Sequence, residues 1–365
     1  MFLSHLDFLT DPVNQEKLDI IVFEHEGDHI VHGELFSSQN AYPIIGGVPR
    51  LLVGELKKDL LQKKYAFFDL FKDKLSDKLK HEWQHAIKEI ENLDAFMRHQ
   101  KKTSESFAFE WNNIYKENDF EEKNFLHFLG GYIGKDDIKN KVILDVGCGS
   151  GRFVKMAAVI GAKVSIGVDV SEAVDFAYAL NKHLDNVFIV QGDIYNLPFL
   201  HNIEIVQSIG VLHHLPDPQG GFTAIAQKVI QPNGHMIVWL YARKNNRRAL
   251  YLYEPVRYIT RHMNKKLLMF LCHIPALIVH GINYFTRFIA WLGFKGAVKK
   301  MPFYYYINFP YNMKHNDAFD VLATPKSNYY YAENIQKRFE EAGLKHIQGK
   351  YLHEAGLTFI GMYEK

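Results

Sequence analysis

The fold is decided by Lys141-Val-Ile-Leu-Asp-Val146, which is followed directly by Gly147-Cys148-Gly149-Ser150-Gly151. The first six residues have the length and the apolar content of a buried strand. The residues from Arg152 to Ile160 then predict a helix that Gly161 ends. A strand, a glycine-rich turn and a helix in this order bring backbone amides to a nucleotide at the helix N-terminus.

The glycine spacing distinguishes two kinds of nucleotide-binding turn. A dinucleotide fingerprint, G-x-G-x-x-G, would place its third glycine at Arg152, whereas this chain has D-x-G-x-G-x-G. The spacing therefore disfavours a nicotinamide-dependent dehydrogenase. The next predicted strand, Lys163 to Val170, contains Asp169 near its end. A carboxylate there suits a ribose, because it can accept hydrogen bonds from both hydroxyls.

The rest of the chain divides into stretches of different pattern. Apolar runs alternate with helical patterns from Lys141 to about Tyr241, which is typical of βαβ units and a parallel sheet. A further helix and two strands are predicted after residue 330. We therefore expect a core over 136–241 and 328–365, preceded by a small β-rich module (1–54) and a helical connector (55–135), and interrupted by a helical insertion (242–327).

Composition excludes several classes of protein. The 365 residues are 47% hydrophobic and 23% charged, as in a folded protein, and the net charge of +2 gives no global field for nucleic acid. Two cysteines, Cys148 and Cys272, cannot form a disulfide framework or a four-thiolate zinc site. The first fifteen residues lack the pattern of a signal peptide, so we expect a cytoplasmic protein.

Four motifs in order resemble those of class I S-adenosylmethionine-dependent methyltransferases. They are the glycine-rich stretch, Asp169, Gly192-Asp193-Ile194, and Ser208-Ile-Gly-Val-Leu-His-His-Leu-Pro-Asp217. The resemblance covers about residues 141–240 and the closing strands. It implies an α/β fold with a Rossmann-like seven-stranded sheet and S-adenosyl-L-methionine as cofactor.

The resemblance also implies the cofactor-binding residues. Asp145 and the glycine turn would hold the methionine part, Asp169 the ribose, and Asp193 the adenine amino group. The implied set is Asp145, Gly147, Cys148, Gly149, Gly151, Asp169, Val170, Asp193, Ile194 and Ser208. From the residues alone, Asp193 could instead cap a turn, and Cys148 could simply fill space.

The two histidines after the fourth core strand are the candidate catalytic residues. Histidine titrates near neutral pH, so His213 or His214 could take a proton from an attacking hydroxyl, and His214 is preferred. The alternative is a pair of loop histidines that only shape the pocket. No Asn/Asp-Pro-Pro-Tyr signature and no Pro-Cys dipeptide are present, which disfavours nucleobase acceptors. No acidic triad indicates a catalytic metal.

The N-terminal module resembles the small zinc-ribbon-like module that activates certain methyltransferases. The resemblance lies in Asp11-Pro12-Val13-Asn14 and in Ala41-Tyr-Pro-Ile-Ile-Gly-Gly-Val-Pro-Arg50. The cysteine pairs of that family would fall on Asp11–Asn14 and near Ser37–Asn40, where this chain has none. We therefore expect no zinc, although His25, His29 and His32 are conceivable ligands.

The segment from Thr103 to Trp111 resembles an element that covers the cofactor pocket in related bacterial methyltransferases. Phe107, Phe109 and Trp111 alternate along it. This alternation also allows a second interpretation, in which the segment is extended and packs on the core without contacting the cofactor.

The insertion combines basic and apolar stretches. Arg243 to Lys266 holds eight Lys and Arg against Glu254 alone, and Leu267 to Phe285 has no charged residue. Three interpretations are open: a substrate lid, an interfacial helix that contacts a membrane through 243–287, and a membrane-spanning helix, which the polar residues in the run disfavour. Asp320 is a further candidate near the active site.

These observations predict a methyltransferase acting on a small-molecule or lipid-like acceptor, preferentially at oxygen. One alternative is an RNA or protein methyltransferase, which the activator-like module and the basic run favour and the net charge disfavours. The other is a scaffold that binds S-adenosylmethionine without turnover.

Overall fold

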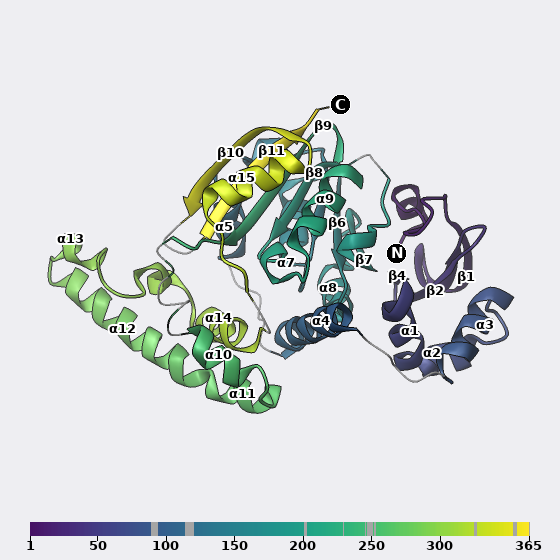
Figure 1. Cartoon of the computed structure of the whole chain (residues 1–365), viewed down its shortest axis with the longest axis horizontal. Coiled ribbons are helices and arrows are strands. Elements are labelled where there is room, and N and C mark those ends of the chain that lie inside the picture. The colour runs from purple at the N-terminus through teal and green to yellow at the C-terminus, as the bar shows by residue number, and fades with distance from the viewer. Residues whose placement is uncertain are drawn as a thin grey trace.

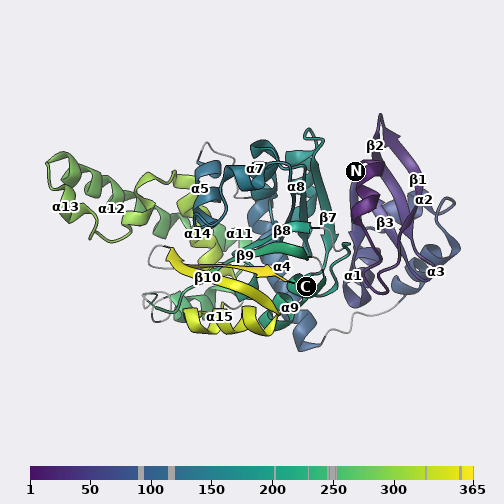
Figure 2. The same cartoon turned by 90° about the horizontal axis from the view of Figure 1, so that it is seen from above.

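The computed structural model describes residues 1–88, 94–113, 120–200, 203–228, 230–244, 246, 251, 253–324, 327–352 and 356–364. Within these residues eleven strands form one mixed sheet, in the order β1-β2-β3-β4-β7-β6-β5-β8-β9-β11-β10. Figures 1 and 2 show the sheet running through the molecule, with the N-terminal strands at one end and a helical arm projecting at the other.

The core of the sheet has the seven strands expected for the methyltransferase-like fold. Its parallel part consists of β7 (Val187–Gly192), β6 (Val164–Asp169), β5 (Val142–Val146), β8 (Ile203–Ile209) and β9 (Ile230–Tyr241). The hairpin of β10 (Leu344–Leu352) and β11 (Gly356–Tyr363) adds to β9 in antiparallel orientation.

Helices cover both faces of this core, as its apolar strands require. Leu144 of β5 belongs to a cluster with residues of α9 (Pro218–Lys228) and α15 (Ala332–Glu341). Its neighbour Ile143 points to the opposite face and packs with α5 (Glu121–Phe128) and α7 (Arg152–Ile160). The short helix α6 (Lys135–Ile138) and α8 (Ala173–Asn181) complete the helical layers.

The N-terminal strands are part of the same sheet rather than a separate unit. After η1 (Leu3–Phe8), a meander of β1 (Asp19–Glu26), β2 (His29–Phe36), β3 (Ala41–Ile45) and β4 (Val48–Leu51) leads to the core. β4 runs parallel to β7, pairing Arg50 with Gln191 and Leu51 with Gly192. This pairing covers the edge that β7 would otherwise leave open.

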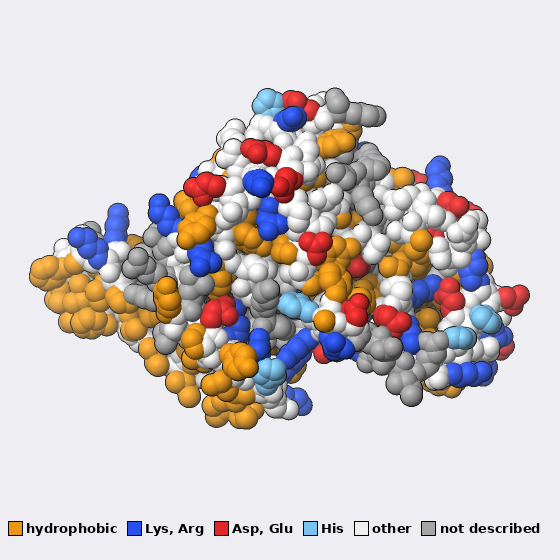
Figure 3. Space-filling model, in the orientation of Figure 1, with side chains coloured by type: hydrophobic (Ala, Val, Ile, Leu, Met, Phe, Trp, Pro, Cys, Tyr) orange, Lys and Arg blue, Asp and Glu red, His pale blue; other side chains and the backbone are white. Residues whose placement is uncertain are grey.

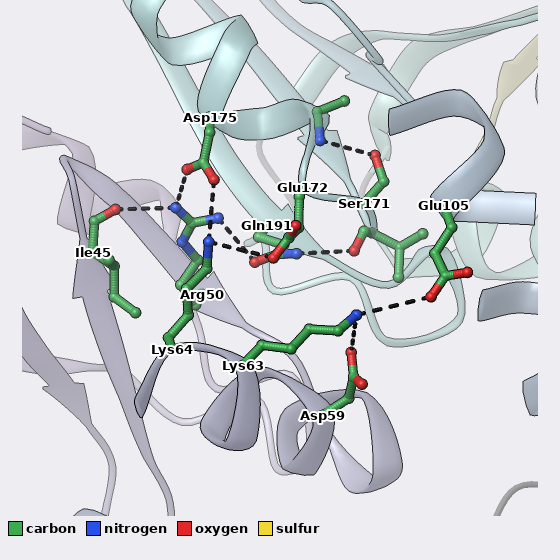
Figure 4. Close-up of polar contacts among 12 residues, drawn as sticks. Ile45, Arg50, Asp59, Lys63, Lys64, Glu105, Ser171, Glu172, Asp175 and Gln191 are labelled. Carbon is green, nitrogen blue, oxygen red and sulfur yellow. Dashed lines mark hydrogen bonds and ion pairs between the residues drawn. The ribbon is translucent and has the colours of Figure 1, made fainter. Parts of the chain in front are cut away.

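A buried arginine holds this junction together (Figure 4). Arg50 is 1% exposed, and it donates to the Gln191 side chain at 3.0 Å, to the Ile45 carbonyl at 3.1 Å and to Asp175 of α8. Lys64 reaches Asp175 and Glu172 from a more exposed position. The junction therefore ties β4 to both β7 and α8.

The helical stretch after the meander divides between two places. α1 (Gly54–Lys63), α2 (Tyr65–Phe71) and α3 (Asp77–Ala86) form an apolar cluster with Phe23 and Ala41 of the meander. α4 (Ala95–Asn113) lies instead against the core and contacts α8. The interpretation of Thr103 to Trp111 as an extended segment is wrong, because these residues lie within α4.

The insertion between β9 and α15 is helical. It contains α10 (Glu254–Thr260), α11 (Lys265–Leu271), α12 (His273–Trp291), α13 (Lys295–Val298), η5 (Tyr304–Asn308) and α14 (Tyr311–Ala323). α14 packs against α4, while α12 and α13 extend away from the sheet (Figures 1 and 2). By length and composition Lys265–Trp291 could cross a membrane, and only 22% of its most apolar window is buried.

Candidate active site

A cavity opens at the carboxyl ends of the core strands, where open α/β sheets bind ligands. Residues after β5, β6, β7 and β8 line it, and α4 closes it from the side. The lining residues are Gln100, Thr103, Ser104, Phe107, Val146, Gly147, Gly149, Val168, Asp169, Val170, Gly192, Asp193, Ile194, Ile209, Gly210, Val211, His214, Leu215 and Pro216.

The turn after β5 needs its glycines. Gly147 has φ +80°, and a Cβ there would lie 2.4 Å from a methyl carbon of Val211. Gly151 has φ +74°, and a Cβ there would lie 2.8 Å from the amide nitrogen of Asn181. These positive φ values and close approaches exclude a side chain at either position; at Gly147 the backbone itself therefore lines the cavity, and Gly151 packs closely on α8 behind it. The N–H groups of Gly147 and Cys148 both donate to the Val168 carbonyl, at 2.7 and 3.0 Å.

Asp169 lies at the end of β6, beside the glycine turn. Its carboxylate accepts hydrogen bonds from the backbone N–H groups of Gly149 at 2.9 Å and Ser171 at 2.8 Å. Burial raises its pKa above the usual 3.8, although these hydrogen bonds favour the ionised form. The acid thus fixes the turn and lines the cavity, and its role as a ribose ligand stays a prediction.

Asp193 lies at the end of β7, directly before η2 (Ile194–Asn196). Its Oδ1 accepts from the Gln100 side-chain amide at 2.8 Å and from the Tyr195 N–H at 3.3 Å. It therefore caps a turn, as the simpler interpretation had it, and it also lines the cavity. The bond to Gln100 joins α4 to the core at the expected adenine end.

The sequence reasoning missed the polar residues that α4 contributes. Gln100 Oε1 and Thr103 Oγ1 both lie in the cavity lining, and both are buried without a hydrogen-bond partner among the described residues. Such orphaned atoms are costly unless a ligand or water pairs with them. Gln100, Thr103 and Phe107 recur at helical spacing, a signal that the alternating aromatics obscured.

The two histidines of η3 (Leu212–His214) occupy different positions. His214 lines the cavity, and its Nδ1 is 3.2 Å from the Ser327 hydroxyl while its ring lies 5.2 Å from that of Phe107. His213 is fully buried behind it, with its ring 4.0 Å from that of Tyr241 and neither ring nitrogen hydrogen-bonded among the described residues. Burial lowers the pKa of His213 well below 6.5, so this imidazole is neutral at physiological pH.

Several predicted cofactor residues support the cavity from behind instead of lining it. Asp145 is buried in β5, where burial raises its pKa to about 7. Cys148 packs with Val154 and other apolar residues, and Ser208 donates to the Val146 carbonyl at 2.9 Å. Gly151 begins α7.

Three acidic side chains of α4 and α14 are shielded from solvent: Glu110 is buried, and Asp317 and Asp320 are half-buried. Asp320 accepts a hydrogen bond from the Tyr241 hydroxyl at 3.2 Å, and the Tyr241 ring in turn lies 4.0 Å from that of His213. Glu110 accepts from the Asn316 amide at 2.7 Å, and burial raises its pKa well above 4.5. Burial, followed by the charge of Asp320, raises the pKa of Asp317 to about 7. In the described part of the chain no group of His, Cys, Asp and Glu is arranged to hold a metal ion.

Comparison with known proteins finds a family match over part of the core and relatives at low identity. The profile of the methyltransferase domain family matches residues 144–238. The tRNA U34 carboxymethyltransferase of Ruthia magnifica is 30% identical over 105 residues, which are 28% of this chain and 33% of that protein. The ubiquinone biosynthesis O-methyltransferase of Neisseria meningitidis serogroup C is 28% identical over 137 residues, which are 36% of this chain and 57% of that protein.

Among solved structures, the magnesium protoporphyrin IX methyltransferase of Synechocystis PCC 6803 with bound SAH aligns with a TM-score of 0.43 and 11% identity. The alignment covers 73% of this chain and 98% of that one. The curated relatives are matched over about a third to a little over half of their length. Residues 144–238 form a methyltransferase domain, and its cofactor is S-adenosylmethionine.

Proposed function

We propose that the chain transfers a methyl group from S-adenosylmethionine to a hydroxyl of a small-molecule or lipid-like acceptor. The observation that carries this proposal is the position of His214, which lines the cofactor cavity while Ser327 holds its Nδ1. When bound, the cofactor supplies a methyl group already activated on a sulfonium. The chain then needs to position the acceptor, exclude water and remove a proton.

The residues present fit this cofactor. Asp169 offers a carboxylate to a ribose, and the glycine turn leaves backbone room beside it. Gln100 Oε1 is an unpaired acceptor that suits the amino group of adenine. The α4 helix therefore has a direct part in binding, beyond covering the pocket.

His214 would take the proton from the acceptor hydroxyl as that oxygen bonds to the methyl carbon; the methyl–sulfur bond would break and S-adenosylhomocysteine would leave. His213 is not assigned this role, because it is fully buried and its ring packs at a tilt against that of Tyr241. We assign His213 to holding η3 against the aromatic wall of β9. The similarity to an O-methyltransferase of ubiquinone biosynthesis supports oxygen as the acceptor atom and a quinol or phenol as the first class to test.

The experiment is transfer of labelled methyl from S-adenosylmethionine to separate pools of phenols and quinols, lipid extract, bulk tRNA and protein. His214→Gln should lower kcat by ~10²-fold or more, the usual range for a lost general base, while cofactor affinity stays within about twofold. His183→Gln is the matched control, since His183 is exposed on the core. The proposal fails if tRNA or protein is labelled in preference to small molecules, or if no pool is labelled by a protein that binds the cofactor.

The N-terminal module is proposed as a degenerate, zinc-free activator module fused to the core. Its support is the cluster at the positions of the missing cysteines, where the buried Asp11 carboxylate accepts from Ser37 Oγ, from Asn40 Nδ2 at 2.9 Å and from Tyr42 Oη at 3.0 Å. These hydrogen bonds outweigh burial and keep the pKa of Asp11 below 3.8. Metal analysis of the purified protein should find no stoichiometric zinc, and stoichiometric zinc would refute this assignment.

A further inference from the structure

The outward face of α12 is apolar, whereas a surface helix of a water-soluble domain turns its polar face outward and its apolar face to the core. Its exposed large side chains recur at spacings of one, three, four and seven residues and so form one stripe. They are Ile274 (59% exposed), Leu277 (58%), Ile278 (57%), Tyr284 (62%), Phe285 (55%), Phe288 (51%) and Trp291 (79%). A stripe of this length is far from the scattered single apolar residues of an ordinary surface.

Polar side chains on the inward face of α12 and along its edge hold the helix to the rest of the insertion; Asn283 and Thr286 are buried, and His273 and Arg287 are exposed. His273 Nδ1 lies 2.7 Å from the Tyr311 hydroxyl, and Asn283 donates its side-chain amide to the Phe303 carbonyl at 2.9 Å. Arg287 donates to the Ile307 carbonyl. These contacts with η5, α14 and the residues before them fix the rotation of α12, so the apolar stripe is held outward.

The stripe continues onto the neighbouring helices. Exposed apolar side chains of α10, α11 and the residue before α13 extend it, namely Val256, Tyr258, Ile259, Leu267, Phe270 and Phe294. Figure 3 shows hydrophobic side chains covering the outer edge of the arm made by α12 and α13, with a second group over α10 and α11. We call the stripe and these residues the apolar face.

Beyond Glu254 at the start of α10, the charged residues of the segment that carries the apolar face have one sign. The sequence from Pro255 to Asn316 contains no Asp or Glu, while Pro255 to Lys300 contains eight Lys and Arg. Arg257 is buried and paired with Glu254, but Lys266, Lys299 and Lys300 are exposed. An anionic lipid surface matches this combination, because it offers hydrocarbon to the stripe and negative headgroups to its basic flanks. A second copy of the chain would instead bring like charges together.

We propose that the apolar face docks on the surface of an anionic lipid bilayer, with α12 lying in the plane of the interface. A spanning orientation would require His280, Asn283 and Arg287 to cross the hydrocarbon and to give up their contacts with the rest of the insertion. An in-plane helix keeps those contacts and buries only the stripe.

Docking would also place the active site near lipid, a link that rests on the proposed function. α11 and α14 share an apolar cluster, in which Leu268 and Phe319 lie, with Phe109 of α4 packed against it. α14 also carries Asp320, which Tyr241 contacts beside His213. The helices that form the apolar face therefore pack against α14, which in turn packs against α4 of the cavity wall and contacts Tyr241 beside the histidines.

The test is co-sedimentation of the full chain with two kinds of vesicle, without cofactor or acceptor. One kind is phosphatidylcholine alone, and the other is phosphatidylcholine and phosphatidylglycerol in equal parts. We expect binding to the anionic vesicles at least tenfold stronger than to the neutral ones, weakened by added salt. Leu277→Glu/Phe288→Glu should lose at least tenfold in binding to the anionic vesicles, and Lys299→Glu/Lys300→Glu should lose the preference for them.

The matched control is Leu70→Glu, since Leu70 is a large apolar residue that is 74% exposed and lies on α2, outside the apolar face. It should bind vesicles like the wild type.

Failure of the wild type to bind anionic vesicles would overturn the proposal, as would equal binding by Leu277→Glu/Phe288→Glu. Self-association abolished by that double variant in the absence of lipid would show that a second copy covers the face. Resistance of the membrane-bound chain to alkaline carbonate would show that the segment spans the bilayer. Because no cofactor is present, these outcomes are independent of the methyl-transfer assay.

Discussion

Replacing Arg50 by methionine tests whether the N-terminal strands are an integral part of the sheet. The change keeps the apolar stem and removes the guanidinium that bonds Gln191, Ile45 and Asp175. Gln191 is 3% exposed, so its carbonyl oxygen would be left buried and unpaired at a cost of ~1–3 kcal/mol, and the Ile45 carbonyl adds about 1 kcal/mol. The Asp175 side chain is 45% exposed and regains water, so its loss of a partner adds less than ~1 kcal/mol.

The expected loss in the free energy of unfolding is therefore about 2–5 kcal/mol. Lys64→Met is the matched control, because Lys64 contacts the same Asp175 from the surface and should cost less than ~1 kcal/mol. Both values come from urea unfolding of the full chain followed by fluorescence. Because Gln191 also donates to the Val170 carbonyl at 3.0 Å, Arg50→Met should weaken cofactor binding as well. Equal and small losses for the two variants would refute the role given to the buried arginine.

Three further predictions concern the cavity and His5 of η1, whose ring lies 4.3 Å from that of Phe188 in β7. Asp169→Ala should weaken cofactor binding by ~1.5–3 kcal/mol, or roughly 10- to 150-fold in Kd by calorimetry, and an unchanged Kd in a folded variant would mean that the ribose lies elsewhere. Gly147→Ala should cost about 2–4 kcal/mol of stability, because its Cβ would overlap Val211 at a positive φ; Gly27→Ala, also at positive φ but in open space, should cost only about 1 kcal/mol in the same unfolding assay. Burial lowers the pKa of His5 from 6.5 to about 3, so the unfolded chain binds more protons between these values and stability falls as the pH falls. The difference in the free energy of unfolding between wild type and His5→Phe should change by up to ~1.4 kcal/mol per pH unit between these two pKa values. A difference that stays constant with pH would contradict this prediction.

The parts of the fold that local sequence determines could be predicted. The glycine turn and α7 follow from an apolar run, positive-φ glycines and a glycine at the helix end, and these act over a few residues. The hairpin of β1 and β2 forms around Gly27, as its turn residues indicate. Cavity residues such as Asp169, Asp193 and His214 follow strand ends, and the rule for parallel sheets brings strand ends together.

The parts that depend on long-range packing could not be predicted in this way. An arginine in a short strand predicts solvent exposure, yet Arg50 is buried because β4 pairs with a strand about 140 residues away. The alternation of Phe107 and Phe109 suggested a strand, although tertiary packing holds both within α4. The sequence of α12 does not say which of its faces points inward; its packing on η5 and α14 decides this, with Ala276, Asn283 and Thr286 buried and the apolar stripe exposed.

The central claim is that the cavity at the carboxyl ends of the core strands binds S-adenosylmethionine. Calorimetric titration of the full chain with S-adenosylmethionine, S-adenosylhomocysteine and NADH tests it most directly. We predict one site for each of the first two ligands, weakened in parallel by Asp169→Ala, and no binding of NADH. Binding of NADH in place of the other two, or binding of none of them by the folded protein, would contradict the account.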